Sequence, residues 1–556
     1  MDIDRRNLLK GAAIVGGVAA LSGLAACNTG TPSTPSKDDD KKPKWDEEFD
    51  IVIVGGGGAG FIAGIECGNN DPKATIIILE KMSAAGGSTS LSGGNIGAMG
   101  TDNLLAFAES SGNPIYKNDT HQMYLEDKLK AGCYYGHPPI TKLFCYNSTD
   151  NFKWNESMGI KWNGSRYYEN PVEEPSNWRV SKLYQASQYM SVFDEKGMSD
   201  MVNRRFRYNI GSTYTNPKGE QLTGGRADFG CWYDNYLKNP NAELRLDSAV
   251  KSIVREGQIT GDVTGVVLDD GTRIRAKRAV ILAAGGYHGN GDLVHHCDPR
   301  VPTDVKTSGG PGCTGDMLFA AQLVGAQVVN MQCVQIDFGG SVKEPSMSGN
   351  NSSNILNGPR TFVEVAKDGK RFWPEKGNDE QYMDAENCIL HANGIRTWFR
   401  VGDKNGLANR TPENFEAFEK TYGKVCNTLD EAATFIGCPA ATLKETITNY
   451  NKFVDAKKDD EWGKAKGYLT NKIEEPPFYV SEHTFYCRTT PGGLQIDTDS
   501  QVVDVMGKKI PRLFAAGEQT GNVHGRFRNN GGDSMCDVTC FGRLSAQSAI
   551  KLTSVE

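Results

Sequence analysis

Short apolar runs that end in glycine-rich turns indicate the strands of the fold. The run 50–54 is β-branched and is followed at once by the glycine-rich segment 55–60, a pattern typical of a buried parallel strand that turns directly into a helix. Similar runs at 75–79, 276–286 and 513–518 end in an acidic residue or in glycines. Strands and helices in this order predict an α/β fold with a parallel sheet.

The middle of the chain departs from this pattern and predicts a second domain. Segment 429–456 is mostly polar with apolar positions at helical spacing. A chain of 556 residues also exceeds what one simple core organises. We predict a signal at 1–27, a linker at 28–47, a first domain formed by 48–337 and 488–556, and an inserted domain at 338–487.

The first residues have the composition of a targeting signal. Arg5-Arg6 is a twin-arginine pattern, and the small-apolar run 11–26 that follows is too short for a membrane span. The end of this run resembles a lipobox with Cys27 as the lipidated residue, although a signal cut nearby would leave Cys27 incidental. The Thr/Pro/Ser-rich and charged segment after it reads as a tether. We expect twin-arginine export to the cell surface or periplasmic side, with a lipid anchor in the membrane.

Charge and cysteine content exclude several classes of protein. The net charge of -7 gives no sign of a nucleic-acid binder. The 14 cysteines are scattered through a long chain, so most are expected to be buried and outside disulfides. No Cys-x-x-Cys-His motif for covalent haem occurs, no compact cysteine run supports an iron–sulfur cluster, and we predict no metal site.

The glycine turn after the first strand predicts dinucleotide binding. Gly55 permits the tight turn, Gly57 lets the backbone approach a pyrophosphate, and Gly60 allows close packing of helix on strand. The start of the helix then offers unpaired N–H groups to the phosphates. Glu80 ends the second strand, where a carboxylate meets a ribose hydroxyl.

Further motifs resemble one flavoprotein family. Segments 86–94, 276–286, 513–518 and 531–535, taken with the glycine turn, are similar to the flavoprotein subunits of fumarate reductases and succinate dehydrogenases, including flavocytochrome-type fumarate reductases, urocanate reductase and 3-ketosteroid dehydrogenases. The resemblance covers about 50–549. It implies a Rossmann-like FAD-binding domain with an inserted α+β capping domain, in which segment 369–375 is similar to the family's Gly-Lys-Arg-Phe-x-Asn-Glu turn.

The resemblance also implies which residues contact FAD. The helix after Ser534 would point its N-terminus at the flavin N1–O2 edge, where negative charge develops on reduction. The histidine that carries covalent flavin in membrane-bound relatives has no counterpart at 87–89, so non-covalent FAD is expected. The expected cofactor-binding residues are Gly55, Gly57, Gly58, Ala59, Gly60, Glu80, Lys81, Gly87, Ser88, Ser92, Gly93, Gly94, Val250, Ala284, Gly285, Asp316, Glu518, His524, Ser534 and Met535.

The catalytic residues of fumarate reductases are only partly matched. Thr489, Asp337 and Asp379 stand where that family places a histidine, a histidine and the acid arginine. Only the C-terminal arginine has a counterpart, as Arg528 shifted by one position. A complete clamp for a dicarboxylate is therefore not expected. The candidate catalytic residues are Tyr486, Arg488, Arg526 and Arg528, with packed or surface-paired side chains as the alternative.

The resemblance predicts a flavin-dependent reductase. Reduced FAD would deliver hydride to the electron-poor carbon of an activated C=C bond in a small enoate or enone, while a side chain protonates the neighbouring carbon. Electrons would come from a membrane quinol-oxidising or multihaem cytochrome, as in anaerobic respiration. Two alternatives stay open, namely a dehydrogenase of a saturated ketone or steroid and an extracytoplasmic flavin electron carrier.

The signal interpretation makes a direct prediction about export. Replacing Arg5 and Arg6 together by Lys should leave the precursor in the cytoplasm, because the export route recognises the arginine pair. Cys27→Ala should leave export intact and abolish lipidation. Cell fractionation with detection of the chain measures both results, and unchanged export of the double-lysine variant would refute the twin-arginine assignment.

Overall fold

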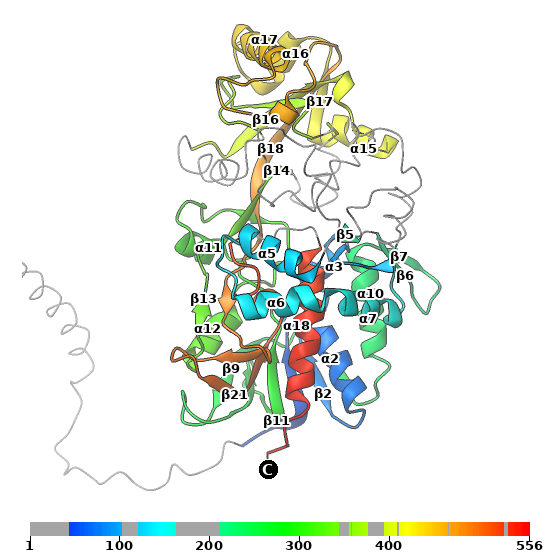
Figure 1. Ribbon diagram of the computed structural model, residues 1–556, viewed down its shortest axis with the longest axis vertical. Coiled ribbons are helices and arrows are strands. Elements are labelled where there is room, and N and C mark those ends of the chain that lie inside the picture. Colours follow the sequence, from blue (N-terminus) through cyan, green and yellow to red (C-terminus); the bar gives the residue numbers. More distant parts are fainter. Residues whose placement is uncertain are drawn as a thin grey trace, which may run out of the picture. The chain divides into compact units, whose positions relative to one another are not determined.

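The computed structural model describes residues 44–102, 120–162, 208–209, 211–343, 355–356, 358–375, 394–408, 411–464, 466–526 and 532–555. The chain divides after Lys44, and every element below belongs to the unit Trp45–Glu556 (Figure 1). The expected signal, with Arg5, Arg6 and Cys27, lies outside the described residues, as do Asp379 and Arg528. No helix of the described part is both long and apolar enough to cross a membrane.

Parallel strands form the centre of the largest sheet. They run in the order β8 (Ala242–Arg245), β2 (Ile76–Leu79), β1 (Glu47–Val54), β11 (Arg273–Leu282) and β21 (Lys509–Ala515). Val52 of β1 lies opposite Val280 on one side and Ile77 on the other. Antiparallel strands β20 (Gln501–Val503), β10 (Val263–Leu268) and β9 (Val250–Arg255) extend the sheet. The strands expected from the apolar runs are thus confirmed.

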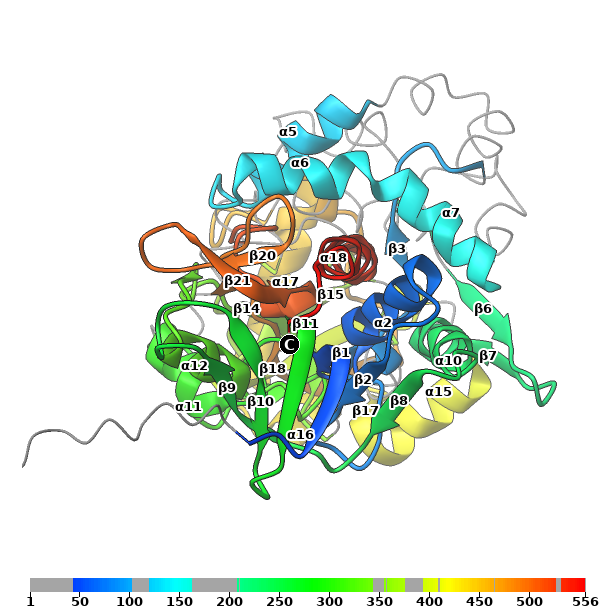
Figure 2. The ribbon, with the colours of Figure 1, turned by 90° about the horizontal axis from the view of Figure 1, so that it is seen from below.

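Helices cover the centre of this sheet, and residues that lie there, such as Val52 and Ile77, are fully buried. Figure 2 shows α2 (Gly58–Asn70), α10 (Gly225–Tyr236) and α18 (Asp533–Ala549) beside strands β1 and β2. Phe61 of α2 packs edge-on against Phe229 and Tyr236 of α10, with ring centroids 5.1 and 5.3 Å apart. A Cβ on Gly542 of α18 would lie 3.0 Å from the Ala59 carbonyl oxygen. The main core therefore joins the beginning, middle and end of the chain.

A second hydrophobic core lies around another sheet. Its strands are β12 (Lys306–Thr307), β14 (Gln335–Ser341), β15 (Phe362–Val365), β16 (Thr397–Asp403), β17 (Gly423–Cys426) and β18 (Phe478–Thr489). Helices α16 (Leu429–Ile436) and α17 (Ala440–Ala456) pack on it through apolar residues such as Leu443 and Ile447, and they confirm the helices expected within 429–456. The long strand β18 pairs with β16 and β17 in its first part and with β12 and β14 in its last part.

The other helices and strands of the described residues are mostly short. They are α3 (Gly87–Ser90), β3 (Ile96–Gly97), α5 (His121–Ala131), α6 (Pro138–Tyr146), α7 (Ser148–Met158), β4 (Lys161–Trp162), β5 (Tyr208–Asn209), β6 (Ser212–Thr215), β7 (Gln221–Thr223), α11 (Gly291–Cys297), α12 (Asp316–Leu323), β13 (Val328–Val329), α15 (Pro412–Ala417) and β19 (Gly493–Leu494). The cysteines in the described residues form no disulfide, and most of them are buried, as the sequence predicts.

A buried ionic network stabilises the second core. Arg371 donates to Glu375 and to Asp459, each at 2.7 Å, and all three side chains are fully buried. Lys464 lies 3.6 Å from the Glu375 carboxylate and donates to the hydroxyl of Tyr450 on α17. The turn 369–375 is thereby tied to the segment that follows α17, which gives its Arg and Glu a structural role.

Removing the central cation of this network should destabilise the protein. Arg371→Met would leave Glu375 and Asp459 buried without their partner, a change that costs about 3–5 kcal/mol. Chemical denaturation at neutral pH measures the free energy of unfolding. The control Lys404→Met breaks the exposed pair with Glu475 (48% and 53% exposed side chains) and should cost at most about 1 kcal/mol. Equal losses in the two variants would contradict a special role for the buried network.

The same network predicts that the free energy of unfolding depends on pH. Burial alone would raise the pKa of Asp459, but the hydrogen bond and charge of Arg371, with backbone N–H groups, outweigh it and hold this pKa below its ordinary value. Because the pKa of Asp459 is lower in the folded state than in the unfolded state, where it is about 4, its charged form stabilises the fold at pH values above about 4. This stability is lost as the pH falls through the folded-state pKa. The difference between wild type and Arg371→Met should therefore shrink in acid.

Candidate active site

Glycines shape the turn between β1 and α2 around the edge of a cavity. Gly55 has a φ of +113°, and a Cβ there would lie 2.4 Å from the Ala283 carbonyl oxygen. A Cβ on Gly60 would lie 2.1 Å from the carbonyl oxygen of Gly55, whereas one on Gly57 would meet nothing within 4 Å. Gly55 and Gly60 thus have the turn and packing geometry that the sequence predicts, and Gly57 faces open space.

The carboxylate of Glu80 is held by the backbone at the end of β2. Its Oε2 accepts the N–H of Gly56 at 2.8 Å, and its Oε1 accepts the N–H of Met82 at 2.8 Å. Glu80 therefore fixes the glycine turn to the neighbouring strand while lining the cavity. Beside it, Lys81 forms an ion pair with Asp316 at 2.9 Å, and both residues also line the cavity.

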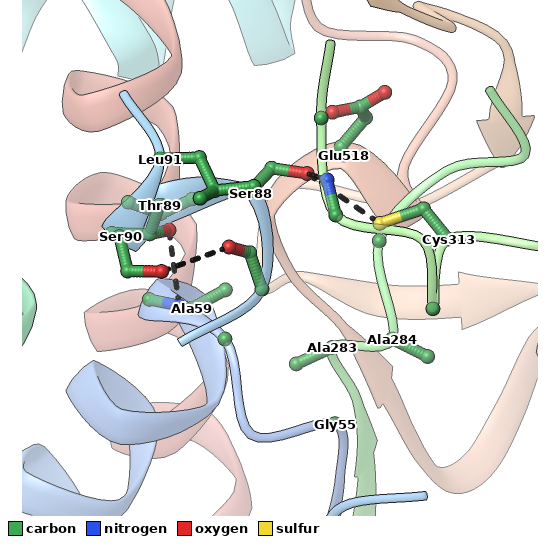
Figure 3. A pocket seen from close by; sticks show the side chains of 18 of the residues that line it. Gly55, Ala59, Ser88, Thr89, Ser90, Leu91, Ala283, Ala284, Cys313 and Glu518 are labelled. Carbon is green, nitrogen blue, oxygen red and sulfur yellow. Dashed lines mark hydrogen bonds between the residues drawn. The ribbon is translucent and has the colours of Figure 1, made fainter. Parts of the chain in front are cut away.

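The cavity measures about 710 Å³ and collects residues from distant parts of the sequence (Figure 3). This volume lies within the range of cofactor sites. The expected cofactor-binding residues in its lining are Gly55, Gly57, Gly58, Ala59, Glu80, Lys81, Gly87, Ser88, Ser92, Gly93, Val250, Ala284, Gly285, Asp316, Glu518, His524, Ser534 and Met535. Gly60 and Gly94 lie outside the lining. A Cβ on Gly94 would approach the backbone of Gly224 to 2.2 Å, so this glycine is required by packing.

One wall of the cavity is a loop that the sequence analysis missed. Segment 308–313 lines it, and the N–H of Gly310 donates to Ser88 Oγ at 2.9 Å. Ser88 Oγ also lies 3.6 Å from the thiol of Cys313 and 3.3 Å from Nε2 of buried His288; Figure 3 shows Ser88 and Cys313 facing each other. Burial, followed by the nearby charge of Glu518, raises the pKa of the Cys313 thiol to about 12. The glycine-rich run 309–312 is the feature of the sequence that could have predicted a loop close to the cofactor site.

The last residues of β18 bring side-chain chemistry to the cavity. Tyr486 and Arg488 both line it, with Tyr486 buried and Arg488 exposed. Residues two apart on a strand point to the same face, which accounts for their joint position. Thr489 also lines the cavity, and its buried hydroxyl has no hydrogen-bond partner within the described residues. A buried polar group without a protein partner is typical of a ligand-binding wall.

The start of α18 forms another wall. Ser534 and Met535 line the cavity, as does His524, whose Nε2 lies 2.8 Å from the carboxylate of Asp537 one turn into the helix. Asp537 was missed because nothing in the sequence joins it to His524. Arg526, a candidate catalytic residue, is not part of the lining. Its backbone N–H donates to the Gly132 carbonyl at 2.9 Å.

Comparison with known proteins identifies the family. Residues 50–533 match the family model described as FAD binding domain. The chain belongs to this family. Its sequence is 28% identical to NADH:acrylate oxidoreductase of Vibrio harveyi, over 91% of this chain and 51% of that protein, so it spans about half the length of this relative. It is 27% identical to urocanate reductase of Eggerthella lenta, over 91% of this chain and 75% of that protein.

The fold is shared with solved flavoproteins. The open conformation of a flavocytochrome c3 fumarate reductase matches with a TM-score of 0.69 and 24% identity, over 91% of this chain and 79% of that one. This shared fold agrees with the family assignment, and FAD is the cofactor that the family binds. The residues fit this cofactor, because Gly57 leaves open space for a pyrophosphate beside the start of α2 and the Glu80 carboxylate lies next to the glycine turn.

Glu80 offers a direct test of this fit. In Glu80→Gln one oxygen becomes an NH₂ group, which cannot accept a backbone N–H or a ribose hydroxyl. Loss of a hydrogen bond to a charged group costs about 1.5–3 kcal/mol, so FAD should bind roughly 10- to 100-fold more weakly. Fluorescence titration of the apoprotein measures the affinity. Glu220→Gln, on an exposed turn away from the cavity, is the control, and equal affinities in the two variants would refute the role of Glu80.

Proposed function

We propose that the protein is an exported reductase of a small enoate or enone that carries a ring. The observation that carries this proposal is the position of Tyr486 and Arg488, a proton donor and a cation on one face of β18 at the wall of the cavity. Bound FAD supplies the two electrons of the reduction. The relatives named for acrylate and urocanate support an activated C=C bond as the reacting group.

Each side chain has a distinct role in this proposal. The hydroxyl of Tyr486 donates the proton that completes saturation, because it lies at the cavity wall and a phenol can act as a general acid. The guanidinium of Arg488 binds the carboxylate or polarises the carbonyl that activates the double bond. Arg526 and Arg528 remain candidates for the same polar role.

The site is poorly suited to fumarate. A dicarboxylate needs cationic or hydrogen-bonding groups at both ends, yet a neutral hydroxyl at Thr489 stands where fumarate reductases have a histidine. Asp337 stands where fumarate reductases have a second histidine. It pairs with Tyr486 in the register of strands β14 and β18. The aromatic ring of Tyr486 at the cavity wall offers a surface for a ring instead. We infer that the substrate carries fewer negative charges than fumarate.

The second core supports an enzyme rather than an electron carrier. We propose that it caps the cavity and excludes water, since β18 runs from this core directly to Tyr486. An electron carrier needs an exposed redox group. We further propose that electrons come from a membrane quinol-oxidising or multihaem cytochrome, because the sequence has no motif for covalent haem of its own.

A competition assay tests the substrate class. Reduced benzyl viologen serves as donor, and fumarate is compared with aryl-enoates, imidazole acrylates and 3-keto-4-ene steroids. Losing two or three charged contacts of about 1.5–3 kcal/mol each should make fumarate slower by several powers of ten. Fumarate turnover as fast as the best ring-bearing substrate would refute the proposal, and no turnover of any of them would favour a carrier.

Variants and donors refine the same assay. Tyr486→Phe should lower kcat by roughly 10²- to 10⁴-fold with FAD retained. Tyr479→Phe is the matched control, because Tyr479 is a half-buried tyrosine of the same strand that does not line the cavity. Rapid turnover with NADH as sole donor would contradict a separate electron-donating protein.

A further inference from the structure

A buried ion pair lies at the first residue of α18, directly behind the cavity wall. Lys128 of α5 donates to the Oδ2 atom of Asp533, and both side chains are fully buried. Tyr124, one turn earlier on α5, donates to the other carboxylate oxygen at 3.5 Å. The next two residues of α18, Ser534 and Met535, line the cavity.

The charges of Lys128 and Asp533 have opposite effects on the electrostatic potential at this wall. The positive end of the α18 dipole favours negative charge in front of it, but a buried carboxylate at the first helical residue acts against that effect. Lys128 compensates the carboxylate, and a charge in a buried site acts over a longer range than one in water. With the pair intact, the carboxylate is neutralised and the field of the helix end is retained.

We propose that Lys128 and Asp533 together set the reduction potential of the bound FAD. Two-electron reduction adds negative charge to the cofactor, so an uncompensated Asp533 disfavours the reduced form and an uncompensated Lys128 favours it. Both are positioning residues, since neither lines the cavity. The inference rests on FAD lying with its ring near Ser534 and Met535, and it is independent of the proposed substrate.

The pair also has a structural role that the test must separate from this one. A Cβ on Gly97 of β3 would lie 3.0 Å from Asp533 Oδ1, and the N–H of Gly97 donates to the Gly532 carbonyl. The ammonium of Lys128 lies 4.9 Å from the ring centroid of Phe144 on α6. Breaking such a contact loosens the helix start in either variant, whereas the electrostatic effect changes sign between them.

The experiment measures the midpoint potential of bound FAD by anaerobic dye-coupled titration in three variants. Lys128→Met should lower the potential, Asp533→Asn should raise it, and the double variant should lie between them near wild type. We expect each single change to alter the ratio of reduced to oxidised FAD affinity by at least about tenfold, which is about 30 mV for a two-electron couple. Lys142→Met, which removes the same charge from an exposed position on α6, should leave the potential unchanged.

Most other outcomes overturn the inference. Shifts of both single variants in the same direction, or no shift, would assign the pair a structural role only. If one single variant loses FAD, the direction of the potential shift in the other single variant decides: the predicted direction supports the inference, and the opposite direction or no shift overturns it. Loss of FAD from both would also assign a structural role. None of these results bears on the substrate competition, so failure here and failure of the proposed function remain distinguishable.

Discussion

The close approach of Gly60 to the carbonyl oxygen of Gly55 determines where the cavity lies. Because a Cβ on Gly60 would lie 2.1 Å from this oxygen, glycine at this position lets α2 begin immediately after the turn that ends β1. Gly56 is then near enough to β2 for Glu80 to accept its N–H. A larger residue at position 60 would displace the helix, the turn and the carboxylate together. The parallel strands on either side end at the same edge, so their loops meet around this turn.

Strand β18 joins this edge to the second core. Its first part pairs with β16 and β17, and its last residues reach the cavity. The buried network of Arg371 stiffens the core from which the strand emerges. In the proposed reaction rigid support of this kind matters, since a displacement of about 1 Å at a reacting group can cost about a hundredfold in rate. The position of Tyr486 therefore depends on residues that never touch the cavity.

The sequence predicts those parts of the site that depend on local pattern. The apolar runs and the glycines that end them place β1, β2, β11 and β21 correctly, because burial on both faces of a parallel strand requires an uninterrupted apolar run. Most of the FAD residues that the family resemblance implies line one cavity, while Gly60 and Gly94 lie outside it. Pairs between distant segments could not be predicted in this way. Ser88 and Cys313 meet across 225 positions, and Lys128 and Asp533 across 405, with no local periodicity that connects them.

The charges around the cavity follow a consistent arrangement. Lys81 is paired with Asp316, His524 with Asp537, and Lys128 with Asp533. Burial of an uncompensated charge is costly, so such pairing is expected in the walls of a closed site. It also means that these groups contribute little net positive charge toward a bound anion. Arg488 of β18 also lines the cavity, and its side chain is exposed. The ion pairs in and behind the cavity walls therefore shape the electrostatic potential that a bound group meets.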